Sequence, residues 1–161
     1  MNASGPAQHW SSTTFRELRT PEASPVLDHI SLRVADYARS KLFYQQALAP
    51  LGYSLAMENS SGAGFRSGHI PAFWVKEGTP PTANWEALPS GSEGCGGPLL
   101  HVAFVAQTRD QVDDFHRAAL AAGGRDNGRP GLRPFYHPNY YGAFVLDPDG
   151  YNIEAVCHRP V

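Results

Sequence analysis

The sequence predicts an α+β fold: two βαβββ modules form a curved sheet around a central cavity, with the helices on the outside. Two observations lead to this prediction. First, a shift of 72 positions aligns His29 with His101, Phe43 with Phe115 and Gly52 with Gly124 without any insertion. Second, each copy opens on a strand pattern and continues with a helical pattern, which is followed by short strand-like segments. An internal repeat of this kind predicts two similar units that share one core.

The opening strand of each copy carries a histidine opposite its apolar face. In HISLRV (29–34) every second residue is apolar, and HVAFVA (101–106) repeats much of that alternation. Because successive side chains of a strand point to opposite faces of the sheet, His29 and His101 face away from the apolar side. Two related sheets that face each other would therefore bring both imidazoles into one concavity.

A helix is predicted to follow each opening strand. Asp36 and Thr108 are suitable N-caps, and Thr108 with Gln111 forms a capping-box pattern. Gly52 and Gly124 stand where a helix commonly ends in a left-handed residue. The apolar residues expected to face the core are Leu42, Phe43 and Leu48 in the first copy and Val112, Phe115 and Leu120 in the second.

Three further strands are expected after each helix. The expected strands are 53–58, 64–67 and 71–77 in the first copy, and the region around 133–137, then 141–147 and 151–158, in the second. The tetrapeptide DPDG (147–150) predicts a turn between the last two. Each copy is too short to bury much surface alone, so pairing supplies the missing core. The predicted organisation is a tail or arm (1–25), a first module (26–78), a connector rich in Pro, Gly and Ser (79–98) and a second module (99–161).

Composition narrows the class of partner. A net charge of −2 offers no face for a polyanion, so nucleic acid is not expected as a partner. No apolar stretch approaches the roughly 18 residues of a membrane-spanning helix, and the N-terminal residues lack a signal-peptide core. The two cysteines suit a reducing compartment, although a single disulfide is also compatible with that number. The expected location is the cytoplasm.

A carboxylate shares the orientation of the two histidines. In YNIEAVCH (151–158) the apolar residues form one face and Glu154 falls on the other. Together, His29, His101 and Glu154 form a predicted 2-His-1-carboxylate set, which binds a divalent first-row ion and leaves positions open for substrate. These donors do not distinguish Zn, Fe, Mn or Ni. For either histidine alone, the alternative is a half-buried side chain satisfied by a hydrogen bond.

Residues 26–158 resemble the vicinal oxygen chelate superfamily, which includes glyoxalases, bleomycin resistance proteins and extradiol dioxygenases. The resemblance rests on DHISLRV…FYQQALAPLGY in the first copy and on FHRAALAAGGR…YYGAFVLDPDGYNIEAV in the second. It implies a single glyoxalase-like domain with metal ligands at His29, His101 and Glu154. It also implies a homodimer, in which the site lies either within one chain or between two. At the position that matches Glu154, the first copy has Trp74, which cannot be a fourth ligand.

The resemblance implies a metal-dependent enzyme of the lyase or isomerase type that acts on a small oxygenated substrate chelated to a divalent ion. Glu154 is also a candidate base within that site. One alternative is an Fe(II) dioxygenase of the extradiol type, although many such enzymes have four modules rather than two. Another alternative is a non-catalytic drug- or metabolite-binding protein of the bleomycin resistance type.

The segment RPGLRPFYHPNYYG (129–142) gathers hydrogen-bond donors and aromatic rings just before the strand hairpin that carries Glu154. His137 and Tyr141 are candidate acid–base groups, and Arg133 suits an anionic substrate. An aromatic-rich loop that simply packs on the sheet is the alternative interpretation. The residues expected to line a substrate pocket are Arg133, Tyr136, Tyr140, Trp74 and Phe73, and Trp85 in the connector is a further candidate to cover it.

Overall fold

The computed structural model describes residues 27–81 and 100–160. The predictions for the tail (1–25), for connector residues 82–98 and for Trp85 lie outside the described residues. Within the described part of the chain, no helix is both long and apolar enough to cross a membrane.

The first module folds as a strand, a helix and three further strands. Its four strands form one sheet in the order β1-β4-β3-β2, with β1 parallel to β4 and the other pairs antiparallel. Its elements are β1 (Ile30–Val34), α1 (Tyr37–Ala47), the 3₁₀ turn η1 (Ala49–Leu51), β2 (Ser54–Asn59), β3 (Gly62–Arg66) and β4 (Phe73–Glu77).

The second module repeats this arrangement. Its sheet has the order β5-β8-β7-β6, again with one parallel pair, β5 and β8. Identical strand orders in the two modules agree with the internal repeat of the sequence. The elements are β5 (His101–Val105), α2 (Arg109–Ala121), β6 (Arg125–Leu132), β7 (Tyr141–Leu146) and β8 (Asn152–Cys157).

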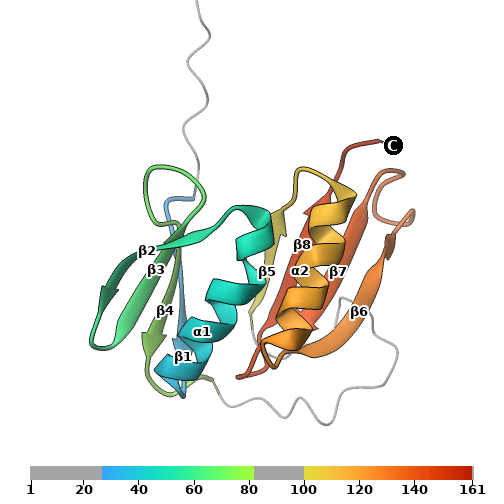
Figure 1. The fold of residues 1–161 in the computed structure, drawn as a ribbon. Coiled ribbons are helices and arrows are strands. Elements are labelled where there is room, and N and C mark those ends of the chain that lie inside the picture. Colours follow the sequence, from blue (N-terminus) through green and yellow to red (C-terminus); the bar gives the residue numbers. More distant parts are fainter. Residues whose placement is uncertain (1–26, 82–99, 161) are drawn as a thin grey trace, which may run out of the picture.

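The predicted α+β class with two βαβββ modules is confirmed. Helices α1 and α2 lie side by side in front of the sheets in Figure 1, where α2 crosses in front of β8 and β5 is seen between the two helices. In the described residues the eight strands form two four-stranded sheets that are not joined by strand pairing. The apolar face of each sheet packs with the helices in one continuous core, so the faces that carry the predicted site residues are the opposite ones.

Most of the local predictions are confirmed. Asp36 accepts a hydrogen bond from the Arg39 amide, and Thr108 accepts one from the Gln111 amide, as N-caps do. Gly52 is left-handed, with a φ of 81°, as predicted. At the end of α2 the left-handed residue is Gly123 rather than Gly124, so the predicted position was wrong by one residue.

Three other expectations are corrected. The region around 133–137 is a turn, and the strand expected there lies earlier, at β6. Leu42 and Leu120 were expected in the core, but they lie on the exposed faces of α1 and α2. Tyr44 and Ala119 take the buried places instead.

An aromatic cluster joins the two modules inside the shared core. The Phe73 ring of the first module packs edge-on against Phe104 of the second, with ring centroids 5.2 Å apart. Tyr53 packs on the same Phe104 ring in a similar geometry. Edge-to-face pairs of this kind add about 0.5–1.5 kcal/mol each beyond the burial of their area. The two modules are therefore parts of one packed unit.

The DPDG turn also links the modules, through hydrogen bonds from residues in and just before α1, one of which is buried. Asp147 is almost fully buried and accepts a 2.6 Å hydrogen bond from the Tyr44 hydroxyl of α1. Asp149 accepts hydrogen bonds from the Ala35 amide and the Ser40 hydroxyl, at the start of α1. The turn was expected only to connect β7 to β8, but it is also hydrogen-bonded to the first module.

Gly124 offers a test of this packing. A Cβ at this position would lie 2.9 Å from the Ala119 carbonyl and 2.9 Å from the Phe43 ring, so one neighbour is rigid backbone. We expect Gly124→Ala to lower the free energy of unfolding by about 1–3 kcal/mol, as overpacking does. Gly68→Ala is the matched control, because nothing lies within 4 Å of its Cβ position. Urea unfolding of both variants measures the difference; equal stabilities would contradict tight packing around Gly124.

Candidate functional site

His101 and Glu154 lie together on the second sheet. His101 begins β5, and Glu154 lies in the adjacent parallel strand β8, opposite Ala103. The His101 Nε2 and Glu154 Oε2 atoms are 2.9 Å apart. The His101 side chain is 41% exposed, whereas that of Glu154 is only 2% exposed. The structure therefore brings together two of the three predicted metal ligands, one accessible and one buried.

Tyr140 holds the second oxygen of the Glu154 carboxylate. Its hydroxyl donates a hydrogen bond of 2.5 Å to Glu154 Oε1. A buried carboxylate is costly unless its oxygens have partners, and here each oxygen has one. Gly142 makes room for the pair, since a Cβ there would lie 2.9 Å from Glu154 Oε1 and 3.1 Å from the Tyr140 ring.

The Tyr140 hydroxyl keeps its proton at neutral pH. Burial, together with the hydrogen bond to Glu154 and the charge of that carboxylate, raises the pKa of Tyr140 well above its ordinary value. Tyr140 is therefore a permanent donor to Glu154 and fixes the orientation of the carboxylate. Tyr140 was expected to bind substrate, and its contact with Glu154 was not foreseen.

The geometry of the pair suits ligands of one metal ion. Two neighbouring ligands at about 2.1 Å from an ion in octahedral geometry lie roughly 3.0 Å apart. The 2.9 Å separation of His101 Nε2 and Glu154 Oε2 is close to that value. An imidazole and a carboxylate are also common donors for divalent first-row ions. The donors present fit two positions of such a site.

His29 does not join this pair within one chain. It lies just before β1, its side chain is 52% exposed, and its Nδ1 is 2.6 Å from Asp28 Oδ1. Among residues 27–81 and 100–160, no three His, Cys, Asp or Glu side chains are placed to hold one metal ion. The expectation that both imidazoles converge in one concavity is therefore not met by the described part of a single chain.

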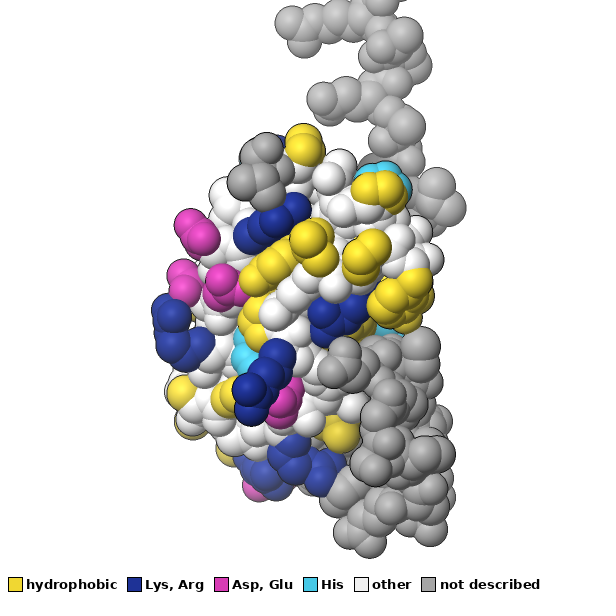
Figure 2. All heavy atoms as spheres, turned by 90° about the vertical axis from the view of Figure 1, so that its right-hand side faces the viewer, with side chains coloured by type: hydrophobic (Ala, Val, Ile, Leu, Met, Phe, Trp, Pro, Cys, Tyr) yellow, Lys and Arg dark blue, Asp and Glu magenta, His cyan; other side chains and the backbone are white. Residues whose placement is uncertain are grey.

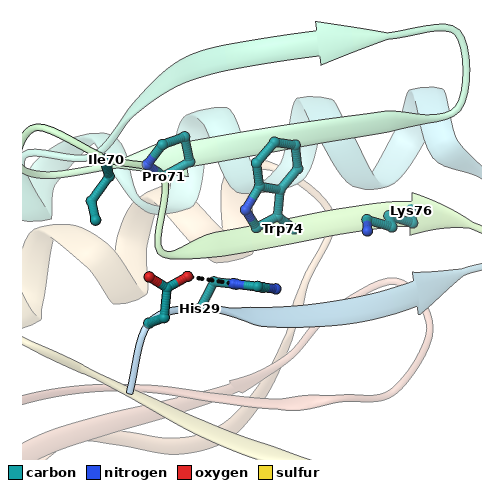
Figure 3. A pocket seen from close by; sticks show the side chains of 6 residues that line it. His29, Ile70, Pro71, Trp74 and Lys76 are labelled. Carbon is teal, nitrogen blue, oxygen red and sulfur yellow. Dashed lines mark hydrogen bonds and ion pairs between the residues drawn. The ribbon is translucent and has the colours of Figure 1, made fainter. Parts of the chain in front are cut away.

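A pocket of about 340 Å³ surrounds His29 instead (Figure 3). Figure 3 shows the indole of Trp74, from β4, beside the imidazole of His29, which directly precedes the adjacent strand β1, with Lys76 further along β4. The lining residues are Asp28, His29, Ile70, Pro71, Trp74 and Lys76. The predicted role of Trp74 as a pocket residue thus fits its position.

Trp74 and Glu154 occupy matching places in the two modules. Trp74 pairs with Ser31, two residues after His29, and Glu154 pairs with Ala103, two residues after His101. The correspondence read from the sequence is therefore present in the strand register. Where the second module has a carboxylate, the first has an aromatic ring.

Two predicted site residues point away from the site. Phe73 was expected to line a substrate pocket, but it is buried on the helix side of β4, next to Tyr44 and Phe104. Tyr141 was a candidate acid–base group, but its hydroxyl donates to Asp113 of α2, on the opposite face of the sheet from Glu154. In both cases strand alternation turns the side chain toward the helices.

The remaining predicted residues lie near Tyr140. The Tyr136 ring packs on the Tyr140 ring at 5.0 Å, and Arg133 lies over the Phe144 ring at 5.7 Å. The His137 ring is 6.2 Å from that of His158, which in turn is 5.1 Å from Tyr140. His137 is exposed, and its Nδ1 accepts a hydrogen bond from the Asn139 amide.

The end of β6 and the loop between β6 and β7 also present apolar surface. Phe135 is 73% exposed, and Leu132 and Tyr136 are about half exposed. In Figure 2, which faces the side of the molecule that carries β6, hydrophobic side chains form a band interrupted by Lys and Arg. Exposed apolar patches of this kind are common at binding surfaces.

Sequence reasoning missed Asp28, Lys76 and Gly142. Strand alternation puts Trp74 and Lys76 on the same face of the sheet, so Lys76 could have been predicted as a pocket residue from the sequence. The pairing of Asp28 with His29 and the space above Gly142 depend on side-chain conformations, for which the sequence carries no signal.

Comparison with known proteins gives consistent matches over both modules. A family model described as "Glyoxalase/Bleomycin resistance protein/Dioxygenase superfamily" matches residues 26–155. The protein YqjT of Bacillus subtilis (strain 168), itself described as uncharacterized, is 30% identical over 132 residues, covering 81% of this chain and 98% of YqjT.

Solved structures share the fold. The crystal structure of a glyoxalase/bleomycin resistance protein from Albidiferax ferrireducens T118 is 30% identical, with a TM-score of 0.63, and the match covers 84% of this chain and 100% of that one. A glyoxalase/bleomycin resistance protein/dioxygenase family enzyme from Burkholderia phytofirmans PsJN is 22% identical, with a TM-score of 0.58, over 82% and 98% of the two chains. The second likeness supports the fold alone.

Proposed function

Since the chain belongs to the glyoxalase/bleomycin resistance protein/dioxygenase superfamily, we propose that it is a metal-dependent enzyme of the lyase or isomerase type. Its substrate is a small oxygenated molecule that chelates a divalent ion. The observation that carries the proposal is the 2.9 Å contact between His101 Nε2 and Glu154 Oε2, two donors of the kind and spacing that such an ion requires. The cytoplasm is the proposed location.

We propose a separate role for each residue of the site. His101 and Glu154 would supply two ligands to a divalent ion, whose Lewis acidity would stabilise negative charge on a substrate oxygen. Tyr140 holds Glu154 through Oε1, which leaves Oε2 beside His101. Glu154 is also the proposed base, and its burial excludes water from the carboxylate. His137 is a proposed acid–base group at the margin of this site.

The third ligand, His29, is proposed to come from a second copy of the chain. The face of each sheet that carries His29 or His101 is turned away from the shared core. Both histidine side chains are therefore accessible to a second copy of the chain. In a symmetric pair, the first module of one copy can face the second module of the other. The exposed Phe135 and Tyr136 provide apolar surface for such contact. The proposed functional unit is therefore a homodimer.

A second candidate is a binding protein of the same superfamily without catalysis. One observation favours it: both Glu154 oxygens already have protein partners, so the buried carboxylate is satisfied by His101 and Tyr140 alone. A protein that binds its ligand on Trp74 and needs no ion would leave Glu154 satisfied by protein groups in this way. The Fe(II) dioxygenase remains an alternative activity for the same ligand set.

Metal analysis of protein purified without chelator separates these candidates. We expect a stoichiometric divalent ion and a dimer in sedimentation. Activity is then tested on a hemithioacetal, an epoxide, a catechol and a 2-substituted acyl thioester. Turnover of the catechol with oxygen uptake under Fe(II) loading would assign the dioxygenase instead. A protein that binds no divalent ion, yet binds an aromatic ligand, would establish the binding protein and overturn the proposal.

Tyr140→Phe tests how Glu154 is held. The ring remains but the hydrogen bond to Glu154 Oε1 is lost, so we expect metal affinity to fall about 10- to 100-fold, as for other outer partners of metal ligands. Isothermal titration with the ion found in the purified protein measures the change. Tyr37→Phe is the matched control, because its hydroxyl bonds Glu58 away from the site. Equal affinities in the two variants would show that Tyr140 does not orient Glu154.

A further inference from the structure

The pocket beside His29 has an aromatic floor. A Cβ added to Gly64 would lie 2.9 Å from three atoms of the six-membered ring of Trp74, so that ring rests directly on the backbone of β3. One face of the indole is therefore covered by glycine and the other is turned toward the pocket (Figure 3). Such a fixed, partly exposed ring offers a stacking surface at low entropic cost.

The walls of the pocket differ in character. Ile70 and Pro71 form an apolar wall at one end of the pocket, which Asp28 and His29 also line. At the other end, the Lys76 ammonium lies 5.8 Å from the centre of the Trp74 ring. No carboxylate among the described residues pairs with Lys76, whereas the chain's other lysine, Lys41, is paired with Glu58 at 2.6 Å. Lys76 therefore has donors available to a ligand that lies on Trp74.

We propose that this pocket binds a planar aromatic carboxylate, with the ring stacked on Trp74 and the carboxylate at Lys76. Its volume, about 340 Å³, is at the lower end of the usual range for small-ligand sites, about 300–1,000 Å³. An aromatic ring fills the space between the indole and the wall formed by Ile70 and Pro71. The acid group faces Lys76, at the opposite end of the pocket from Ile70 and Pro71.

The inference deepens the proposed function, on which it rests for one point only: that the bound molecule is the substrate or part of it. If His29 joins His101 and Glu154 of a second copy, a ligand on Trp74 lies beside the proposed ion. The substrate class is then a small aromatic acid with further oxygen substituents. Binding itself needs only the first module's pocket and no ion.

The test uses 2-naphthoate as the probe and the full chain freed of metal by chelation. Backbone NMR shifts are followed during titration, and 2-naphthalenemethanol serves as the uncharged counterpart. We expect shifts centred on residues 28–29 and 70–76, and tighter binding of the acid than of the alcohol. Trp74→Leu is expected to weaken both ligands about tenfold. Lys76→Met is expected to weaken the acid alone, about three- to fivefold.

Lys41→Met is the control, because it removes the other lysine without touching the pocket, and it should leave both affinities unchanged. Shifts centred elsewhere, equal binding of acid and alcohol, or an equal effect of Lys76→Met on both ligands would overturn the proposal. Since the protein is metal-free, these results are independent of the metal site. Loss of naphthoate binding would leave the proposed enzyme standing, and a failure to bind metal would leave the pocket standing.

Discussion

Replacing His101 by Ala or Glu154 by Gln is expected to weaken divalent-metal binding by at least about a hundredfold. Loss of an outer partner of a metal ligand costs about 10- to 100-fold, and loss of a ligand itself should cost no less. The two atoms that would be removed or altered, His101 Nε2 and Glu154 Oε2, are only 2.9 Å apart and would share the ion. Activity on any substrate should fall with metal occupancy.

Titration calorimetry on purified variants measures this effect, with circular dichroism to confirm folding. His69→Ala is the control, because the hydrogen bond from Arg66 Nη1 goes to the His69 backbone carbonyl, which the substitution keeps. Glu154→Gln keeps the shape of the buried side chain, so it separates loss of charge from loss of packing. If His101→Ala and Glu154→Gln both bound the metal with wild-type affinity, a metal site at these two residues would be contradicted.

Asp147→Ala is expected to lower the free energy of unfolding by about 3 kcal/mol or more at pH 5. Asp147 accepts hydrogen bonds from the Tyr44 hydroxyl and from the amides of Asp149 and Tyr151. The substitution would leave the buried Tyr44 hydroxyl without its partner and loosen the turn between β7 and β8. Because Tyr44 belongs to the other module, the loss also weakens the contact between modules.

Urea unfolding at fixed temperature measures the Asp147→Ala effect, and Tyr44→Phe should reproduce about half of it, since that variant removes one of the hydrogen bonds. Asp114→Ala is the control, because Asp114 forms an ion pair on the surface of α2 with the exposed Arg117. If Asp147→Ala and Asp114→Ala proved equally stable, the turn would not be a structural link between the modules.

The same group gives a pH dependence of stability. Burial raises the pKa of Asp147 to about 6, against an ordinary value near 3.9 in the unfolded chain. The folded state therefore holds this proton more tightly. The stabilisation is complete below about pH 4 and is lost as the pH rises through about 6. Asp147→Asn should remove this loss, so the difference in unfolding free energy between wild type and variant, measured from pH 4 to 7, isolates it. A constant difference would contradict the raised pKa.

Much of the fold could be predicted because the repeat is carried by local patterns. The equal spacing of His29 and His101 from their helices, and the alternation of apolar residues, are enough to define two similar modules. The strand β6 was placed wrongly because Gly128, Pro130 and Gly131 lie inside it, and these residues usually indicate a turn. Its irregular pairing with β7 accommodates them.

The candidate site could be predicted only in part, for a geometric reason. Strand alternation correctly puts Glu154 and His101 on one face, and their contact follows from neighbouring strands. Whether the sheet that carries His29 faces that one depends on how the modules pack, which alternation does not encode. Phe73 and Tyr141 were misjudged because aromatic residues suit a core and a pocket equally well.

The proposed enzyme depends on a metal site that combines His101 and Glu154 of one copy with His29 of another. Mixed dimers of His29→Ala and His101→Ala chains, carrying different affinity tags, test it most directly. In a mixed dimer one site loses both histidines and the other keeps both. We predict that the purified mixed dimer binds one tightly held divalent ion, although neither variant does so alone. A mixed dimer as poor in metal as its parents would contradict a site shared between chains.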